Sequence, residues 1–242
     1  MKKSIEREKD PVKYWAWLVS AGFCAVSGVW FFWRGEAWAG WICLGTMLLL
    51  SLPAFLERWL DVRLQKGFFL FCLAYAMGPM LGKAFKLYYL THWWDKLLHT
   101  SAGFLFAALG AWLAVRLNRG RETSLALQIL LGICVSISIS ALWELVEFGI
   151  DRCFGADMQN DTVVHSIHSY LLGNSPGELY SLSGIRETWV NGAPLISEGY
   201  LDIGLIDTMG DVLVETMGAV AFGVWSIVER GHRPLIQSKS AF

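Results

Sequence analysis

Charged residues are scarce in this chain of 242 residues, where Asp, Glu, Lys and Arg together make up 17%. Soluble domains typically contain about 25% charged residues, and the mean hydropathy here is +0.43. A disordered chain is excluded, because 55% of the residues are hydrophobic and the net charge is only −1. The same balance leaves no basic excess for a nucleic-acid partner, so we expect none.

Motifs typical of paired cysteines, nucleotide binding and zinc proteases are also missing. The five cysteines form no Cys-x-x-Cys pair and four of them lie in apolar runs, so we expect no disulfide framework. The sequence contains neither Gly-x-x-x-x-Gly-Lys nor His-Glu-x-x-His, which would indicate a phosphate-binding loop or a zinc protease. The chemistry of this protein must therefore be sought in the positions of its few charges.

Apolar residues are abundant and form long runs, each near the length of about 20 residues that a transmembrane helix needs. The sequence predicts an all-α fold, a polytopic membrane bundle of about six transmembrane helices within residues 14–230. The expected spans are residues 14–33, 37–56, 67–90, 93–115, 124–150 and 203–228. Residues 1–13 and 231–242 are expected to be cytoplasmic segments, and residues 151–202 the one long outer loop.

Basic residues fix the expected orientation. Of the 20 Lys and Arg residues, 14 fall in the two ends and in the loops 57–66 and 116–123, which share one side of the six-span arrangement. Basic loops remain in the cytoplasm, so we expect both termini inside the plasma (inner) membrane. Trp residues near the ends of the first, second and fourth spans fit interfacial belts. The alternative of a cleaved signal peptide ending near Ala37-Trp38-Ala39 is disfavoured, because its apolar run is long and further spans follow.

Acidic residues are distributed the opposite way, with 14 of 21 on the expected outer side, where four of the five histidines (His92, His99, His165 and His168) also lie. The outer side therefore carries −8 and the inner side +7. Eight ionisable groups recur at helical spacing near the outer ends of three spans, and spacings of three or four residues keep each set on one helix face. They are Asp95 and His99; Glu144, Glu147 and Asp151; and Asp207, Asp211 and Glu215.

Charged groups within membrane spans are costly and usually face the interior of a bundle. Asp, Glu and His are ligands for divalent cations such as Zn²⁺, Mn²⁺ or Fe²⁺, so these eight residues form a candidate metal cluster. Glu144 and Glu147 are also candidate general bases, because burial tunes a carboxyl group toward neutral pH. The alternative is a structural role, with the carboxylates hydrogen-bonded to Lys96, Ser101, Thr208 or the backbone.

The long outer loop offers a weaker signal. Asp161 is placed to cap a short helix with Val164, Ile167 and Leu171 on its apolar face, and its polar stripe would include His165 and His168 as weak metal-ligand candidates. Turns are expected at Asn174–Gly177 and Asn191–Pro194. Small residues in the fourth and sixth spans, including Gly103, Gly110 and Gly218, predict close helix packing.

The order Asp-x-x-x-His, Glu-x-x-Glu and Asp-x-x-x-Asp, carried by Asp95/His99, Glu144/Glu147 and Asp207/Asp211, resembles the YjdF-like family of uncharacterised bacterial inner-membrane proteins over residues 67–228. The VanZ-like family, associated with glycopeptide resistance, is more distantly similar through Asp95-Lys96…His99 and the late acidic segment ending at Gly218. Its Glu-x-x-x-Gln pattern has no counterpart here. These resemblances imply a membrane protein and name no substrate.

The sequence therefore favours an integral membrane protein with an outward-facing acidic and histidine site. This site is expected to bind a cation or metal and to act on or recognise a lipid or envelope component. A non-catalytic assembly or scaffold protein and a cation- or proton-coupled transporter remain the alternatives. Transport is disfavoured because the inner halves of the spans carry no matching polar stripe. The sequence does not decide between enzyme and non-enzyme, and it leaves the cofactor and the oligomeric state open.

Overall fold

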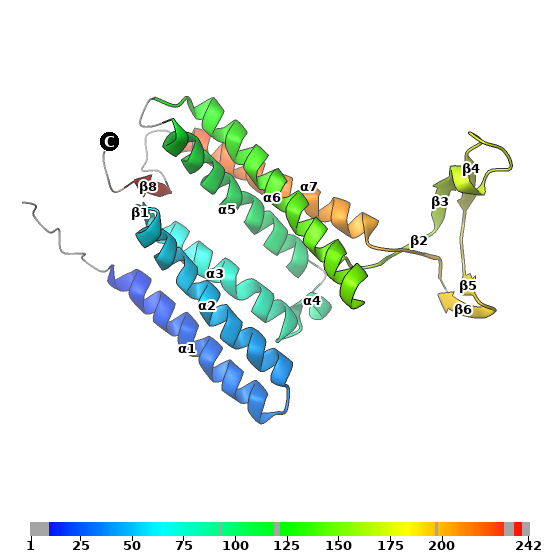
Figure 1. The fold of residues 1–242 in the computed structure, drawn as a ribbon, viewed down its shortest axis with the longest axis horizontal. Helices are drawn as coiled ribbons and strands as arrows, with labels where there is room; N and C mark the ends of the chain where they lie inside the picture. The colour runs from blue at the N-terminus through cyan, green and yellow to red at the C-terminus, as the bar shows by residue number, and fades with distance from the viewer. Residues whose placement is uncertain (1–9, 92, 119–121, 197, 230–234, 239–242) are drawn as a thin grey trace, which may run out of the picture. The chain divides into compact units, whose positions relative to one another are not determined.

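The computed structural model describes residues 10–91, 93–118, 122–196, 198–229 and 235–238 (Figure 1). Most of the expected N-terminal segment, most of the C-terminal tail and His92 therefore lie outside the described residues. The chain divides into two compact units, Met1–Ile139 with Val214–Phe242, and Ser140–Leu213.

Helices dominate the chain, and five of the described helices are long and apolar enough to cross a membrane. Their outward surfaces carry exposed apolar side chains such as Val26, Leu48 and Leu130, as expected for contact with lipid. The predicted all-α membrane bundle is confirmed. These five helices are α1 (Pro11–Trp33), α2 (Ala37–Trp59), α5 (Trp94–Leu117), α6 (Leu125–Phe154) and α7 (Leu205–Val228).

The first helix begins and ends at recognisable signals. The Asp10 carboxylate accepts a hydrogen bond from the backbone N–H of Val12 at 3.0 Å, and Pro11 occupies the first helical position. The helix ends before Gly35, whose φ of +78° favours glycine, and α2 starts two residues later. This short connection makes α1 and α2 antiparallel neighbours.

The expected third span, 67–90, is wrong as a single helix. The structure has α3 (Lys66–Lys83) followed by the separate short helix α4 (Leu87–Leu90), and Lys86 between them has a left-handed φ of +63°. Gly78-Pro79 lies inside α3 and does not end the helix. A Cβ at Gly78 would overlap the Leu98 side chain, so this glycine permits close packing of α3 against α5.

Two short strands join the ends of the first unit. β1 (Val62–Leu64) pairs in antiparallel register with β8 (Ile236–Ser238), and Leu64 lies opposite Ile236. At the same end, Lys13 at the start of α1 donates hydrogen bonds to Glu57 Oε1 at 2.6 Å and to the Leu64 carbonyl at 2.7 Å. The start of α1 and the strand after α7 therefore share one end of the unit, as an even number of crossings requires.

The connectivity of α3 bears on the number of crossings. α3 starts at the β1–β8 end, where the Gln65 N–H donates to the Leu235 carbonyl, and its 18 residues extend about 27 Å. The hydrocarbon core is about 30 Å thick. This length supports the expectation of six crossings, although α3 is not among the five helices that meet the length and composition requirement.

Small residues bring α5, the first part of α6 and the last part of α7 together. A Cβ at Gly103 would overlap the backbone carbonyl of Glu215, and a Cβ at Gly218 would overlap that of Thr100. A Cβ at Gly132 would meet the Ala107 carbonyl at 2.6 Å. These contacts agree with the packing predicted from the small residues, and they hold Glu215 beside the first turns of α5.

The second unit contains the end of α6, six strands and the start of α7. The expected helix after Asp161 is wrong, because Thr162–Val164 and Ser166–Ser169 form strands on either side of His165. The β-branched run Thr162-Val163-Val164 favours this conformation. β2 (Thr162–Val164) pairs with β7 (Tyr200–Asp202), β3 (Ser166–Ser169) with β4 (Tyr180–Ser183), and β5 (Thr188–Val190) with β6 (Ala193–Ile196), all antiparallel.

Both predicted turns of the loop are present. Asn191 and Gly192 have φ values of +52° and +79° between β5 and β6, the left-handed pair that an Asn-Gly hairpin turn requires. Gly177, with φ +84°, lies between the 3-10 turn Tyr170–Leu172 and β4. The loop is thus a series of short hairpins.

Candidate functional site

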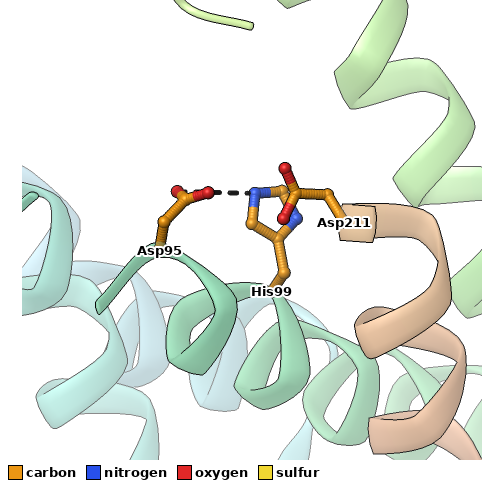
Figure 2. A group of neighbouring side chains, drawn as sticks. All are labelled: Asp95, His99 and Asp211. Carbon is orange, nitrogen blue, oxygen red and sulfur yellow. Dashed lines mark ion pairs between the residues drawn. The ribbon is translucent and has the colours of Figure 1, made fainter. Parts of the chain in front are cut away.

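Asp95 and His99 lie one turn apart near the start of α5. The His99 Nε2 atom is 3.8 Å from Asp95 Oδ1, and Lys96 Nζ is 3.6 Å from Asp95 Oδ2. The dashed line in Figure 2 marks the pair of Asp95 and His99. The imidazole is buried, with 8% of His99 exposed, whereas Asp95 is partly accessible. The predicted i, i+4 pair is therefore formed.

Glu215 on α7 approaches the other ring nitrogen. Its Oε2 is 3.6 Å from His99 Nδ1, and its Oε1 lies 3.5 Å from the Ser136 hydroxyl. Ser136 on α6 also donates to the Gly103 carbonyl at 3.2 Å. Ser136 of α6 thus contacts both the Gly103 carbonyl of α5 and the Glu215 carboxylate of α7 that approaches the imidazole.

Asp211 is the fourth ionisable residue near His99. It lies one turn before Glu215 on α7, which is continuous from Leu205 to Val228. Asp211 is only 1% exposed. One ligand atom from each of Asp95, His99 and Asp211 lies within 4.8 Å of the others, and their side chains point toward one another (Figure 2). We call Asp95, His99, Asp211 and Glu215 the His99 cluster.

Three members of the His99 cluster, Asp95, His99 and Asp211, lie close enough together to hold a metal ion. Ligand atoms at about 2.0–2.2 Å from a tetrahedral zinc lie about 3.3 Å from one another. The ligand atoms of Asp95, His99 and Asp211 lie within 4.8 Å of one another, so contraction to this value requires shifts of at most about an ångström, which side-chain rotation can supply. Among the residues that the structure describes, this is the one set of three or more His, Cys, Asp or Glu side chains placed closely enough for a metal.

Asp151 and Asp207 have a different environment. The Asp151 carboxylate accepts hydrogen bonds from the N–H groups of Met158 and Gln159 at 2.6 and 2.9 Å, and Asp207 Oδ2 accepts from the backbone and side chain of Asn160 at 2.9 and 3.1 Å. These carboxylates clamp the segment that follows α6. These contacts agree with the alternative stated from the sequence, in which the carboxylates have a structural role and accept hydrogen bonds from the backbone.

Glu144 and Glu147 are both buried on α6, with 6% and 7% exposed. Trp143 Nε1 donates to Glu147 Oε1 at 2.8 Å, whereas Gln159 Nε2 lies 3.5 Å from Glu144 Oε2 and 2.5 Å from Thr208 Oγ1. The second oxygen of Glu144, Oε1, has no hydrogen-bond partner among the described residues. An unpaired buried oxygen is costly and calls for a ligand, water or proton.

Most of the sequence matches a known family of membrane proteins. A family model with the description predicted membrane protein (DUF2238) matches residues 16–231. The chain belongs to this family. The match agrees coarsely with the YjdF-like resemblance, whereas the VanZ-like resemblance receives no support. No curated protein and no solved structure matches the chain.

For this multi-pass membrane protein, the loop histidines lie outside the His99 cluster. His165 Nδ1 is 3.2 Å from the Ile185 carbonyl, and His168 Nδ1 is 2.9 Å from the Ser181 hydroxyl; both histidines are exposed. They sit in and beside strands, so the polar helix stripe that was to join them does not form. Their proposed role as metal ligands remains a prediction.

Several aspartates lie near one another in and beside the loop. The pKa of the Asp161 carboxyl is raised by partial burial and by the nearby charges of Asp157, Asp202 and Asp151. The folded loop therefore holds the Asp161 proton more tightly than an isolated carboxyl group would. These four aspartates are among the acidic residues that the sequence places on the expected outer side.

Sequence reasoning missed several polar residues. Ser136 and Ser140 lie eight and four residues before the predicted Glu144, on the same face of α6, and Ser140 Oγ is buried without a hydrogen-bond partner among the described residues. This regular spacing could have identified them. A Gly-x-Ser-x-Gly sequence at Gly173–Gly177 was also missed, but its Ser175 hydroxyl donates to Glu178 Oε2 in a hairpin loop. The strand–turn–helix setting of a nucleophilic serine is absent there.

Proposed function

We propose that the His99 cluster binds a divalent metal ion. The observation that carries this proposal is the convergence of Asp95, His99 and Asp211 within 4.8 Å in a chain where charges are scarce. One imidazole and two carboxylates form a mixed nitrogen and oxygen donor set, which suits Zn²⁺, Mn²⁺ or Fe²⁺. The ion would bind to His99 through a ring nitrogen and to each carboxylate through an oxygen.

Electrostatics supports a bound cation. Asp211 and Glu215 are almost fully buried, and they share the cluster with Asp95 and a single imidazole. Buried carboxylates close to one another are costly unless protons or cations neutralise them. A divalent ion offsets two of these charges at once, and Glu215 would then orient His99 from the opposite ring nitrogen.

The finer proposal is that the site acts on or recognises a lipid or envelope component, with Glu144 as general base. Gln159 holds one oxygen of the Glu144 carboxylate, and the other oxygen has no hydrogen-bond partner among the described residues. Such an oxygen is placed to accept a proton from water or from a substrate hydroxyl. Glu147 remains the second candidate, but Trp143 already donates to one of its oxygens.

Elemental analysis of the purified protein tests the metal proposal. We expect about one equivalent of a transition metal or zinc per chain, because the cluster offers a single three-ligand set. Removal of the ion with a chelator should lower the melting temperature, and restoring it at 100 times its Kd should return about 2.7 kcal/mol of stability. Metal-free protein whose melting temperature does not respond to Zn²⁺, Mn²⁺ or Fe²⁺ would leave the scaffold alternative in place.

We also propose that the protein lies in the plasma membrane with both ends cytoplasmic. Supporting this, the start of α1, β1 and β8 share one end of the first unit, and basic residues predominate in these segments. A phosphatase reporter fused after Gly177 should be active, because that residue would then be external. An active cytoplasmic reporter at the same position would reverse the orientation and with it the outward-facing site.

A further inference from the structure

The hairpin formed by β3, the turn Tyr170–Leu172 and β4 has two chemically different faces. In the register of the strands, Ile167 lies opposite Leu182, while His168 lies opposite Ser181. Side chains alternate between the faces of a strand pair. One face therefore carries Ile167, Leu182 and Tyr180 together with Ser169, and the other carries His168 with Ser166, Ser181 and Ser183.

The apolar face and the tip of the hairpin are open. Leu171 at the tip is 95% exposed, and Leu182 on the face is 40% exposed. The other exposed large apolar residues of the hairpin are Tyr170, Leu172, Leu179 and Tyr180. Six exposed apolar side chains on one two-stranded hairpin indicate an interaction surface, because such a hairpin is only marginally stable by itself.

The polar face is different in kind. His168 pairs with the Ser181 hydroxyl, and Ser166 lies opposite Ser183. Glu178 is the single residue among Asp, Glu, Lys and Arg between positions 166 and 183. The hairpin can therefore lie with its apolar face in a nonpolar medium without burying a charge, and its polar face stays in water.

The membrane around the spans is the nonpolar medium nearest to the hairpin. The apolar surfaces of α6 and α7 continue to the ends of the loop, where Phe154 is 82% and Leu205 63% exposed. Only eleven residues separate Phe154 from Ser166, so the hairpin is tethered within about 40 Å of the end of a membrane span. Tethering keeps the bilayer at a high effective concentration for this surface.

We propose that the apolar face of the β3–β4 hairpin docks into the headgroup region of the bilayer that holds the spans. Tyr170 and Tyr180 have the amphipathic rings that favour this depth, and the leucines enter the outer acyl region. Docking would hold the outer loop against the membrane surface, where lipid headgroups lie. This inference does not depend on the metal proposal.

Adjacent residues on opposite faces give a matched test. In full-length protein with Cys134 and Cys153 replaced by serine, the variants Leu182→Cys and Ser183→Cys are each labelled with an environment-sensitive fluorophore. The labelled protein is reconstituted into phosphatidylcholine vesicles containing lipid with a nitroxide near the headgroup. Protein without an introduced cysteine corrects for label on Cys24, Cys43 and Cys72.

We expect the nitroxide lipid to quench the label at position 182 at least about threefold more than the label at 183, because only the apolar face enters the interface. Leu171→Cys at the tip should behave like position 182. Equal, weak quenching at both positions overturns the proposal. Protection of position 182 from both nitroxide lipid and aqueous iodide also overturns the proposal, because protein would then cover the apolar face. Dilution into more lipid would expose the face if a second copy covers it, and would leave it protected if another part of the same chain does.

Discussion

Replacement of His99 by glutamine is expected to lower the affinity for the bound metal by more than about 100-fold. Loss of an outer partner of a metal ligand typically costs 10–100-fold, and His99 is the only nitrogen ligand of the cluster. Glutamine keeps a polar side chain of similar length, so the protein should still fold. Asp211→Asn should have a similar effect, because a neutral amide binds a divalent cation more weakly than a carboxylate does.

The matched controls use residues outside the cluster. His168→Gln removes an exposed histidine whose ring contacts Ser181, and it should leave the metal content unchanged. Glu144→Gln should also retain the metal if Glu144 is a base rather than a ligand. Metal content and the affinity measured by chelator competition report on each variant. Full occupancy in both His99→Gln and Asp211→Asn would refute the assignment of the cluster.

The second large effect is expected from Gly103→Ala. The added methyl group would overlap the backbone carbonyl of Glu215, and a backbone atom cannot move away without shifting α7. Overpacking of this kind should lower the free energy of unfolding by about 3 kcal/mol. The same shift would move Glu215 away from His99 and should weaken metal binding, measured beside the thermal unfolding of the purified protein.

Gly22→Ala in α1 is the control for helix propensity, because no atom lies within 4 Å of the position that its Cβ would take. This substitution should leave stability unchanged or raise it by up to about 1 kcal/mol, since alanine favours helix more than glycine does. If Gly103→Ala behaved like Gly22→Ala, the close contact between α5 and α7 would not be part of the native structure.

The long helices were predictable because length and apolarity are local properties of the sequence. The expected bounds of α1, α2, α5, α6 and α7 differ from the structure by only a few residues, and the expected span 67–90 is the exception. There the largely apolar run continues to Phe85, but α3 ends at Lys83. The left-handed backbone of Lys86 prevents one continuous helix from reaching residue 90. A one-dimensional pattern does not register such a local backbone reversal.

The loop was predicted less well than the spans. Val164, Ile167 and Leu171 have helical spacing, yet strand pairing of residues 166–169 with 180–183 prevails. Those partners lie more than ten residues apart, so no local window contains both sides of the pairing. The Asn191-Gly192 turn was predictable, because a left-handed conformation is a property of these residues themselves.

The sequence by itself determined that this is a membrane protein, that Asp95 and His99 share a helix face, and that Asp211 and Glu215 share another. It could not divide the eight ionisable groups between roles, because that depends on distances between helices. Tertiary structure made the division: the contact at Gly103 brings Glu215 to His99, while hydrogen bonds from residues 158–160 engage Asp151 and Asp207. Periodicity places a side chain on a face, but only packing decides what that face meets.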